Sequence, residues 1–344
     1  MTTLITHQDL DGIGCSIVFQ LAHAEKINLL TGHILPDIEM KIIYADYNDI
    51  DQVTRDAMGY SDRIIFSDIC PTKDTVRYLF EQEYFFEIHD HHATNLYVKE
   101  LQRSQYPYFP CMINITPKNE DGQLESGTSL LFKHYQEKLK HKYDKQLFTA
   151  TFELLELFVD TVRSYDTYEW KQSGNTVAKE LQTLFSLLTR EVFIRKYIGI
   201  LSSDYHSPPP VVQLIDHFDM EFIQSKLARE QQRIDEITID DVQPVAIGNY
   251  TGILHHYNGL NTSELAHQFL TKYPLNDIFL DVDYNTGVVS IRTTKENIDT
   301  GREIAKPCGG GGHPGASGFS IPKELIEKAA NIIIEYINDN IKAN

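Results

Sequence analysis

Three polar residues near the start of the chain have the types and the spacing of metal ligands: His7, Asp9 and Asp11. In an extended backbone, residues two positions apart point to the same side, so these side chains can converge on one point. Gly12 then permits a tight turn into a following helix. One imidazole and two carboxylates form a metal-ligand set, but a polar turn with a helix-capping aspartate explains the same residues equally well.

Two more clusters follow at the ends of later predicted strands: Asp68 after one strand, and the run Asp90, His91 and His92 after the next. A single aspartate is weak evidence, because aspartate commonly caps helices. Adjacent histidines beside an aspartate are hard to explain by packing, since histidine is a frequent metal ligand and a carboxylate can fix its tautomer. The run therefore favours a metal site, to which Asp68 contributes through its position.

A further aspartate completes the candidate set. Asp166 is followed by Thr167 and by a helix that opens at Asn175. Asp160 lies six residues earlier and competes for the same role, although capping or solvation explains it as well. The residues alone leave this choice open.

A run of four glycines, residues 309–312, directly precedes His313. Without Cβ atoms, backbone N–H groups can crowd around an anion, and the histidine adds a side-chain donor. Arg292 and Arg302 lie nearby in the sequence. A flexible linker is the alternative explanation for the glycines alone, but the neighbouring histidine and basic residues favour anion binding.

These clusters depend on a predicted parallel sheet in the N-terminal part. Strands are predicted at residues 3–6, 41–45, 63–67 and 84–88, and helices at 12–26, 49–58 and 73–83. Short apolar strands alternating with helices indicate βαβ units, in which ligands bind beyond the carboxyl ends of the strands. Residues 126–200 are predicted to be mostly helical.

The second half of the chain predicts a smaller α/β domain. Prolines 208–210 mark the clearest break, and a connecting helix is expected to end near Glu236. A hairpin at residues 277–293, a helix at 297–305, a strand at 318–321 and a final helix at 323–341 follow. We therefore expect a catalytic metal-binding domain at 1–205, a linker with a helix at 206–240, and a second domain at 241–344.

Composition excludes some functions. The net charge of −18 leaves little basic surface for a long nucleic acid, whose binding needs many phosphate contacts. The four scattered cysteines show no CxxC spacing and fit reduced thiols in the cytoplasm. No secretory signal or membrane-spanning stretch is visible, so a membrane partner is not expected.

Taken together, these segments resemble the DHH phosphoesterase family, which is named for the triplet seen here as Asp90, His91 and His92. The segment 309–318 is similar to the hallmark of the type 1 associated domain, DHHA1, and Arg292 matches the strand that precedes that hallmark. The spacing of the first motif resembles the B-type group of bacterial oligoribonucleases, or nano-RNases. The resemblance also favours Asp166 over Asp160 as the fourth motif.

The resemblance implies two divalent ions per chain, usually Mn²⁺, with Mg²⁺ or Co²⁺ as substitutes. One ion would be held by His7 and Asp9, and the other by Asp11, His91 and Asp166. Asp68 would bridge the two ions. His92 would face the phosphate or complete the metal shell.

The second domain is expected to bind the substrate through Arg292, Gly310, Gly311, Gly312 and His313, and Asp68, His92 and His313 are the expected catalytic groups. The implied activity is hydrolysis of short RNA, or nanoRNA, to mononucleotides. The alternatives are a 3′-phosphoadenosine-5′-phosphate phosphatase, a linear dinucleotide hydrolase and, from another class, a non-catalytic nucleotide sensor. Whether the chain forms a homodimer is left open.

Overall fold

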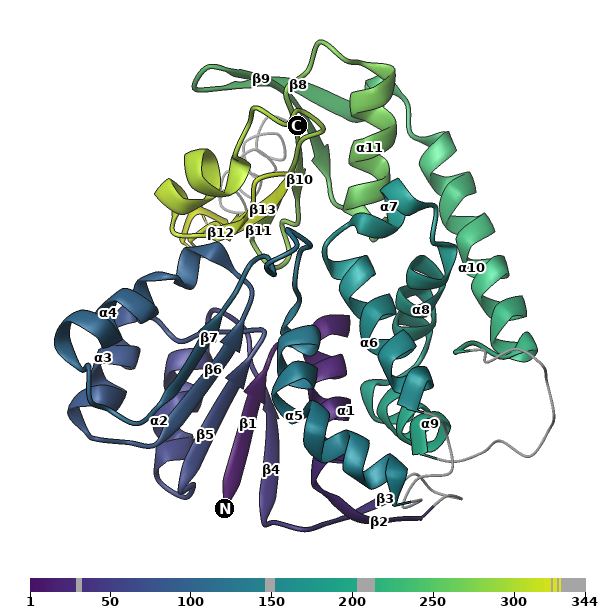
Figure 1. Cartoon of the computed structure of the whole chain (residues 1–344). Helices are drawn as coiled ribbons and strands as arrows, with labels where there is room; N and C mark the ends of the chain where they lie inside the picture. The colour runs from purple at the N-terminus through teal and green to yellow at the C-terminus, as the bar shows by residue number, and fades with distance from the viewer. Residues whose placement is uncertain (29–32, 146–151, 203–213, 323, 327, 329–344) are drawn as a thin grey trace, which may run out of the picture. The chain divides into compact units, whose positions relative to one another are not determined.

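The computed structural model describes residues 1–28, 33–145, 152–202, 214–322, 324–326 and 328. Backbone contacts divide the chain into two compact units, Met1–Ser225 and Lys226–Asn344. Figure 1 labels the helices and strands of both. The boundaries expected from the sequence, at residues 205 and 240, stay predictions. The proline break at 208–210 and the final helix expected at 323–341 lie outside the described residues, apart from short pieces of the latter.

The first unit alternates strands with helices along its first hundred residues and then becomes helical, as the sequence predicts. Its strands are β1 (Thr2–Thr6), β2 (Ala24–Asn28), β3 (His33–Pro36), β4 (Met40–Tyr44), β5 (Arg63–Ser67), β6 (Phe86–Asp90) and β7 (Met112–Ile115). Its helices are α1 (Leu10–His23), α2 (Ile50–Met58), α3 (Lys73–Glu81), α4 (Tyr97–Gln105), α5 (Gly127–Asp144), α6 (Phe152–Asp166), α7 (Glu169–Ser173), α8 (Thr176–Leu187) and α9 (Arg190–Ser202). Helix α10 (His217–Glu236) runs across the division between the units.

Within the described residues, five strands form a parallel sheet in the order β4-β1-β5-β6-β7 (Figure 1). Thr6 pairs with Ser67, and Ser67 pairs with His89, so the carboxyl ends of three neighbouring strands are level. This register places the segments that follow β1, β5 and β6 side by side at one edge of the sheet.

The sheet is buried on both faces, as parallel sheets generally are. One face, with Ile5, Phe66 and Ile88, packs against α2, α3 and α4 in a continuous apolar core. On the other face, α1 contacts β1, and α5 contacts β5 and β6. Each fully buried large apolar side chain contributes about 1.5–3 kcal/mol through the water it excludes.

Several predicted boundaries of the first unit were wrong by two or three residues. The first helix ends at His23 rather than near residue 26, because residues 24–28 form β2, which pairs with β3 in a hairpin. Strand β6 begins at Phe86 rather than at residue 84 and ends at Asp90. His89 and Asp90 are therefore strand residues, and the loop begins only with His91.

The second unit contains a mixed sheet with the order β12-β13-β11-β10-β9-β8 in its described part. The elements are β8 (Val242–Ile247), β9 (Tyr250–His256), α11 (Thr262–Lys272), β10 (Ile278–Val282), β11 (Val288–Arg292), β12 (Gly311–His313) and β13 (Ala316–Ser320). The predicted hairpin is β10–β11, which pair antiparallel. Instead of the helix expected at 297–305, a single π-helical turn occupies Gly301–Ala305.

The α/β fold class predicted from the sequence is confirmed by these elements. A search of the described helices finds none with the length and apolar character that a membrane span requires.

Candidate metal centre

Three neighbouring strands deliver the candidate ligands. His7 follows β1, Asp68 follows β5, and His91 follows β6. The carboxyl ends of the three strands are level, so these side chains arise from one edge of the sheet. The two remaining aspartates of the first motif, Asp9 and Asp11, come from the start of α1.

Asp9 serves the helix and the candidate site at once. It is the N-cap of α1, with one carboxylate oxygen accepting a hydrogen bond from Gly12 N at 3.0 Å. The other oxygen lies 2.9 Å from His7 Nδ1. A Cβ at position 12 would lie 2.1 Å from the His7 carbonyl oxygen, so the turn requires glycine there. Asp9 can therefore cap the helix with one carboxylate oxygen and remain available as a metal ligand through the other.

Asp11 is buried and is held by the N-terminus of α5. Gly127 N and Thr128 N donate to its two oxygens at 2.6 and 3.0 Å. These two N–H groups have no partner within their own helix, and the helix dipole favours a negative charge at this end. The helix therefore fixes the orientation of a carboxylate whose remaining lone pairs point into the site.

Asp68 adopts a left-handed backbone conformation, with φ of 61°. This conformation is uncommon for a residue other than glycine and costs of the order of 1 kcal/mol, which the surrounding structure must offset. A Cβ at position 127 would lie 2.3 Å from the Asp68 Cβ, so only glycine allows α5 to approach this closely. The strain holds the carboxylate at the centre of the cluster rather than at its rim.

His91 is buried among three carboxylates. Its Nε2 lies 3.2 Å from Asp68 Oδ1, 3.5 Å from Asp166 Oδ2 and 3.9 Å from Asp11 Oδ2. Asp166, the last residue of α6, thus reaches the cluster. Asp160 lies two turns earlier, is largely exposed and pairs with Arg163 at 2.7 Å.

The six candidate ligands form two groups of three. Within each group, the ligand atoms lie within 4.8 Å of one another: one group is His7, Asp9 and Asp68, and the other is Asp11, His91 and Asp166. Asp68 belongs to the first group and also contacts His91 of the second. Oxygens and imidazole nitrogens without thiolates suit Mn²⁺ or Mg²⁺.

The electrostatics of the cluster also fit bound cations. Asp68 Oδ2 and Asp166 Oδ2 are buried and accept no hydrogen bond from the described residues. Burial, and next the charges of Asp11 and Asp9, raise the pKa of both carboxyls well above the usual range. Carboxylates crowded in this way are stable in their ionised form only when a cation offsets their charge.

The same negative charges favour the charged form of His7, whereas they disfavour the charged forms of Asp68 and Asp166. Partial burial lowers the pKa of His7, but the hydrogen bond to Asp9 and the nearby carboxylates outweigh it and raise the pKa to about 8. Without a metal, this imidazole therefore carries a proton near neutral pH. A metal ion bound at His7 would displace that proton.

His92 is oriented by a buried carboxylate. Its Nδ1 lies 2.8 Å from Asp90 Oδ1, and Asp90 also accepts from His92 N and from Asn95 Nδ2. Nε2 of His92 therefore faces the site, where Tyr47 OH lies 3.4 Å away.

Tyr47 was missed in the sequence. It follows β4 at the same sheet edge, and its ring lies 5.6 Å from the ring of His7. Its position after a strand of the sheet was the only available signal.

The expected substrate residues lie in the second unit, on and around the strands β12, β13 and β11 at one end of its sheet. Arg292 Nε donates to Ser263 Oγ at 3.0 Å, and His313 ends β12. The glycine run is not a flexible linker, since Gly311 and Gly312 pair with β13. A Cβ at Gly310 or Gly312 would meet backbone at 2.0 or 2.6 Å, whereas a Cβ at Gly311 meets nothing within 4 Å.

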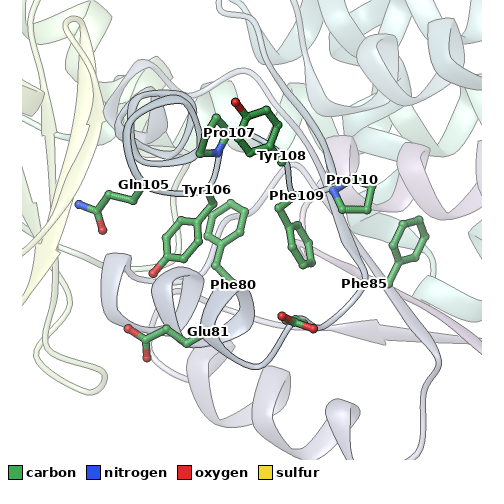
Figure 2. A pocket seen from close by; sticks show the side chains of 10 residues that line it. Phe80, Glu81, Phe85, Gln105, Tyr106, Pro107, Tyr108, Phe109 and Pro110 are labelled. Carbon is green, nitrogen blue, oxygen red and sulfur yellow. The ribbon is translucent and has the colours of Figure 1, made fainter.

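A cavity lies elsewhere in the first unit. Aromatic side chains line a hollow of about 680 Å³ near the ends of α3 and α4 (Figure 2), among them Phe80, Tyr106, Tyr108 and Phe109. These segments lead into the starts of β6 and β7, which is the sheet edge opposite the ligands. The cavity is therefore separate from the candidate ligands.

The chain is similar to known proteins in sequence and in fold. Residues 252–339 match the family model of the DHHA1 domain. The chain is 28% identical to Oligoribonuclease NrnB of Bacillus subtilis (strain 168) over 341 residues, which cover 95% of this chain and 74% of that protein. RecJ of Thermus thermophilus in complex with Mn²⁺ is similar in structure, with a TM-score of 0.53 and 13% identity, over 97% of this chain and 51% of that chain. A pGpG-specific phosphodiesterase, PggH from Vibrio cholerae, has a TM-score of 0.47 and 15% identity, over 98% of this chain and 99% of that chain.

The resemblance to DHH phosphoesterases with a DHHA1 domain is thereby confirmed. The chain is a metal-dependent phosphoesterase that resembles the DHH phosphoesterases in sequence.

Proposed function

We propose that this protein uses two divalent ions to hydrolyse short oligoribonucleotides to mononucleotides. The observation that carries the proposal is the pair of ligand groups, each with three ligand atoms within 4.8 Å of one another, joined by the contact of Asp68 in one group with His91 in the other. The sequence likeness to an oligoribonuclease over 95% of the chain supports the choice of substrate.

In this proposal, His7 and Asp9 hold one ion, Asp11, His91 and Asp166 hold the other, and Asp68 contacts both. The donor set suits Mn²⁺, with Mg²⁺ or Co²⁺ as substitutes, because oxygen ligands predominate and two imidazoles contribute. When bound, two such ions supply a nucleophilic water at neutral pH and offset charge on the phosphoryl oxygens. No side chain needs to act as a nucleophile.

The protein's own contribution is to fix and orient these groups. The N-terminus of α5 holds Asp11, and the strained backbone at Asp68 aims its carboxylate into the cluster. Asp90 accepts the Nδ1 proton of His92, so a neutral ring presents the Nε2 lone pair to the site, and Nε2 donates to a phosphate oxygen only when the ring carries a second proton. A donor that is oriented in advance stabilises developing charge without reorganising during the reaction.

We further propose that Arg292, His313 and the glycines 310–312 bind the substrate through its phosphates. The net charge of −18 opposes contacts with a long backbone, so the attraction is confined to a few groups and a short substrate is favoured.

The glycine run offers a test in which fold and function separate. Gly311→Ala places a methyl group in open space, so stability should be unchanged, but a backbone that approaches a phosphate should lose affinity and KM should rise. Gly312→Ala is the contrasting variant, because φ of 130° and a 2.6 Å clash should destabilise the fold. An unchanged KM in Gly311→Ala would contradict backbone binding at this position.

The experiment that tests the function supplies purified protein and Mn²⁺ with RNA of two to about twenty nucleotides, resolving products by size. We expect kcat/KM to be highest for about two to five nucleotides and mononucleotides to be the product. A kcat/KM that rises steadily to twenty nucleotides would refute the short-substrate proposal.

The same assay separates the alternatives. Turnover of 3′-phosphoadenosine-5′-phosphate alone would identify a monoesterase, and turnover confined to linear dinucleotides would identify a dinucleotide hydrolase. Binding without turnover of any of these substrates would identify a nucleotide sensor.

A further inference from the structure

A further group of candidate metal ligands, separate from the two groups of the metal centre, lies in the first unit and has no part in the proposed reaction. Glu87 and His89 occupy alternate positions of β6, so they face the same side of the sheet, and His134 comes from α5, which packs on that face. Their ligand atoms all lie within 4.8 Å of one another. Glu87 and His89 are buried, and the side chain of His134 is one-fifth exposed.

The spacing of these atoms fits a metal ion better than hydrogen bonds. Glu87 Oε2 lies 3.5 Å from His89 Nε2 and 3.8 Å from His134 Nε2. Hydrogen bonds of this type are about 2.7–3.2 Å long. Ligands bound to zinc at about 2.0–2.1 Å in a tetrahedral arrangement lie about 3.4 Å from one another. The three side chains are thus separated as ligands of one ion would be.

The surroundings complete the site. Arg63 Nη2 binds the other oxygen of Glu87, which orients the carboxylate so that Oε2 faces the imidazoles. Hydrogen bonds of this kind to a ligating carboxylate are a regular feature of metal sites. The rings of His89 and His134 lie 4.6 Å apart.

We propose that Glu87, His89 and His134 bind a zinc ion that is distinct from the catalytic pair. Two imidazoles and one carboxylate are a zinc ligand set, and water reaches the fourth position beside the partly exposed His134. The ion joins β6 to α5. These are the two elements that deliver His91 and hold Asp11, so the zinc steadies the catalytic centre without touching the substrate.

The test measures zinc bound per chain by mass spectrometry after dialysis of the full chain in excess Mn²⁺ and limiting zinc. His134→Gln keeps a polar side chain but removes the imidazole, and we expect it to bind one zinc fewer than the wild type. His141→Gln is the matched control, because His141 lies on the exposed side of the same helix, and it should bind as much zinc as the wild type. Equal zinc in His134→Gln and the wild type overturns the proposal.

A second measurement uses the wild type alone and does not depend on how the variant folds. Co²⁺ added after the catalytic pair is filled should give the intense visible absorption of a tetrahedral ion, and zinc should abolish it. A titration without this signal also overturns the proposal. Circular dichroism confirms that His134→Gln is folded.

Discussion

One face of strand β6 carries Glu87 and His89, and the same alternation continues to His91, yet the two ends of this row have opposite electrostatics. At the carboxyl end, His91 Nε2 lies 3.9 Å from Asp11, 3.2 Å from Asp68 and 3.5 Å from Asp166. At the amino end, Glu87 pairs with Arg63.

The pKa values of the carboxyl groups at the two ends shift in opposite directions. Burial and neighbouring carboxylates raise the pKa of Asp68 well above the usual range. Burial acts in the same direction on Glu87, but His89 and Arg63 outweigh it and lower its pKa. The carboxyl end of the row is therefore short of positive charge and suits divalent ions, whereas the charges at the amino end are nearly balanced.

Removing the shared carboxylate should have the largest effect. Asp68→Ala takes a ligand from both proposed ions, and the loss of several kcal/mol of charge stabilisation corresponds to a fall in kcat/KM of about a thousandfold or more. Mn²⁺-dependent hydrolysis of a short RNA measures it. Activity within about tenfold of the wild type would refute the role of Asp68.

The two aspartates of α6 should differ sharply. Asp166→Asn removes a ligand from the second group and should lower kcat/KM by about a hundredfold or more. Asp160→Asn weakens an exposed pair with Arg163, which keeps Glu169 as a partner, so activity should stay within about twofold. The reverse ranking would place the fourth motif at Asp160.

A change that disturbs the orientation of His92 should lower activity less than the removal of a metal ligand. Asp90→Asn keeps the shape of the buried side chain but weakens its hold on His92 Nδ1. Outer partners of this kind are worth about tenfold to a hundredfold in activity. The loss should appear in kcat while bound Mn²⁺ is unchanged, and a loss of Mn²⁺ instead would make Asp90 a ligand.

Without bound metal, substitutions that remove a carboxylate charge at the two ends of the row should change the melting temperature in opposite directions. In excess chelator, Asp68→Asn should raise the melting temperature by a few degrees, because it removes a crowded charge and asparagine tolerates the left-handed backbone. Glu87→Gln should lower it by a few degrees, because it leaves Arg63 unpaired at a cost of about 1–3 kcal/mol, discounted for partial exposure. Shifts of the same sign, measured by scanning calorimetry, would show that the two ends do not differ in charge balance.

The sequence by itself determined the ligand types and the strands that deliver them. His7, Asp68 and His91 each follow a run whose apolar pattern and following helix are local signals, readable without the fold. The start of β6 was misplaced because Tyr84 and Phe85 are also good strand formers, and only pairing with β5 decides where the strand begins.

Tertiary structure alone decided what surrounds those residues. The strand order places β1, β5 and β6 side by side, and the packing of α5 brings Gly127 to Asp11 and His134 to His89. These contacts join residues far apart in the chain, and periodicity carries no information about such pairs. The ligands of one proposed centre were therefore visible as motifs, whereas Tyr47 and the cluster of Glu87, His89 and His134 became visible only when the chain was folded.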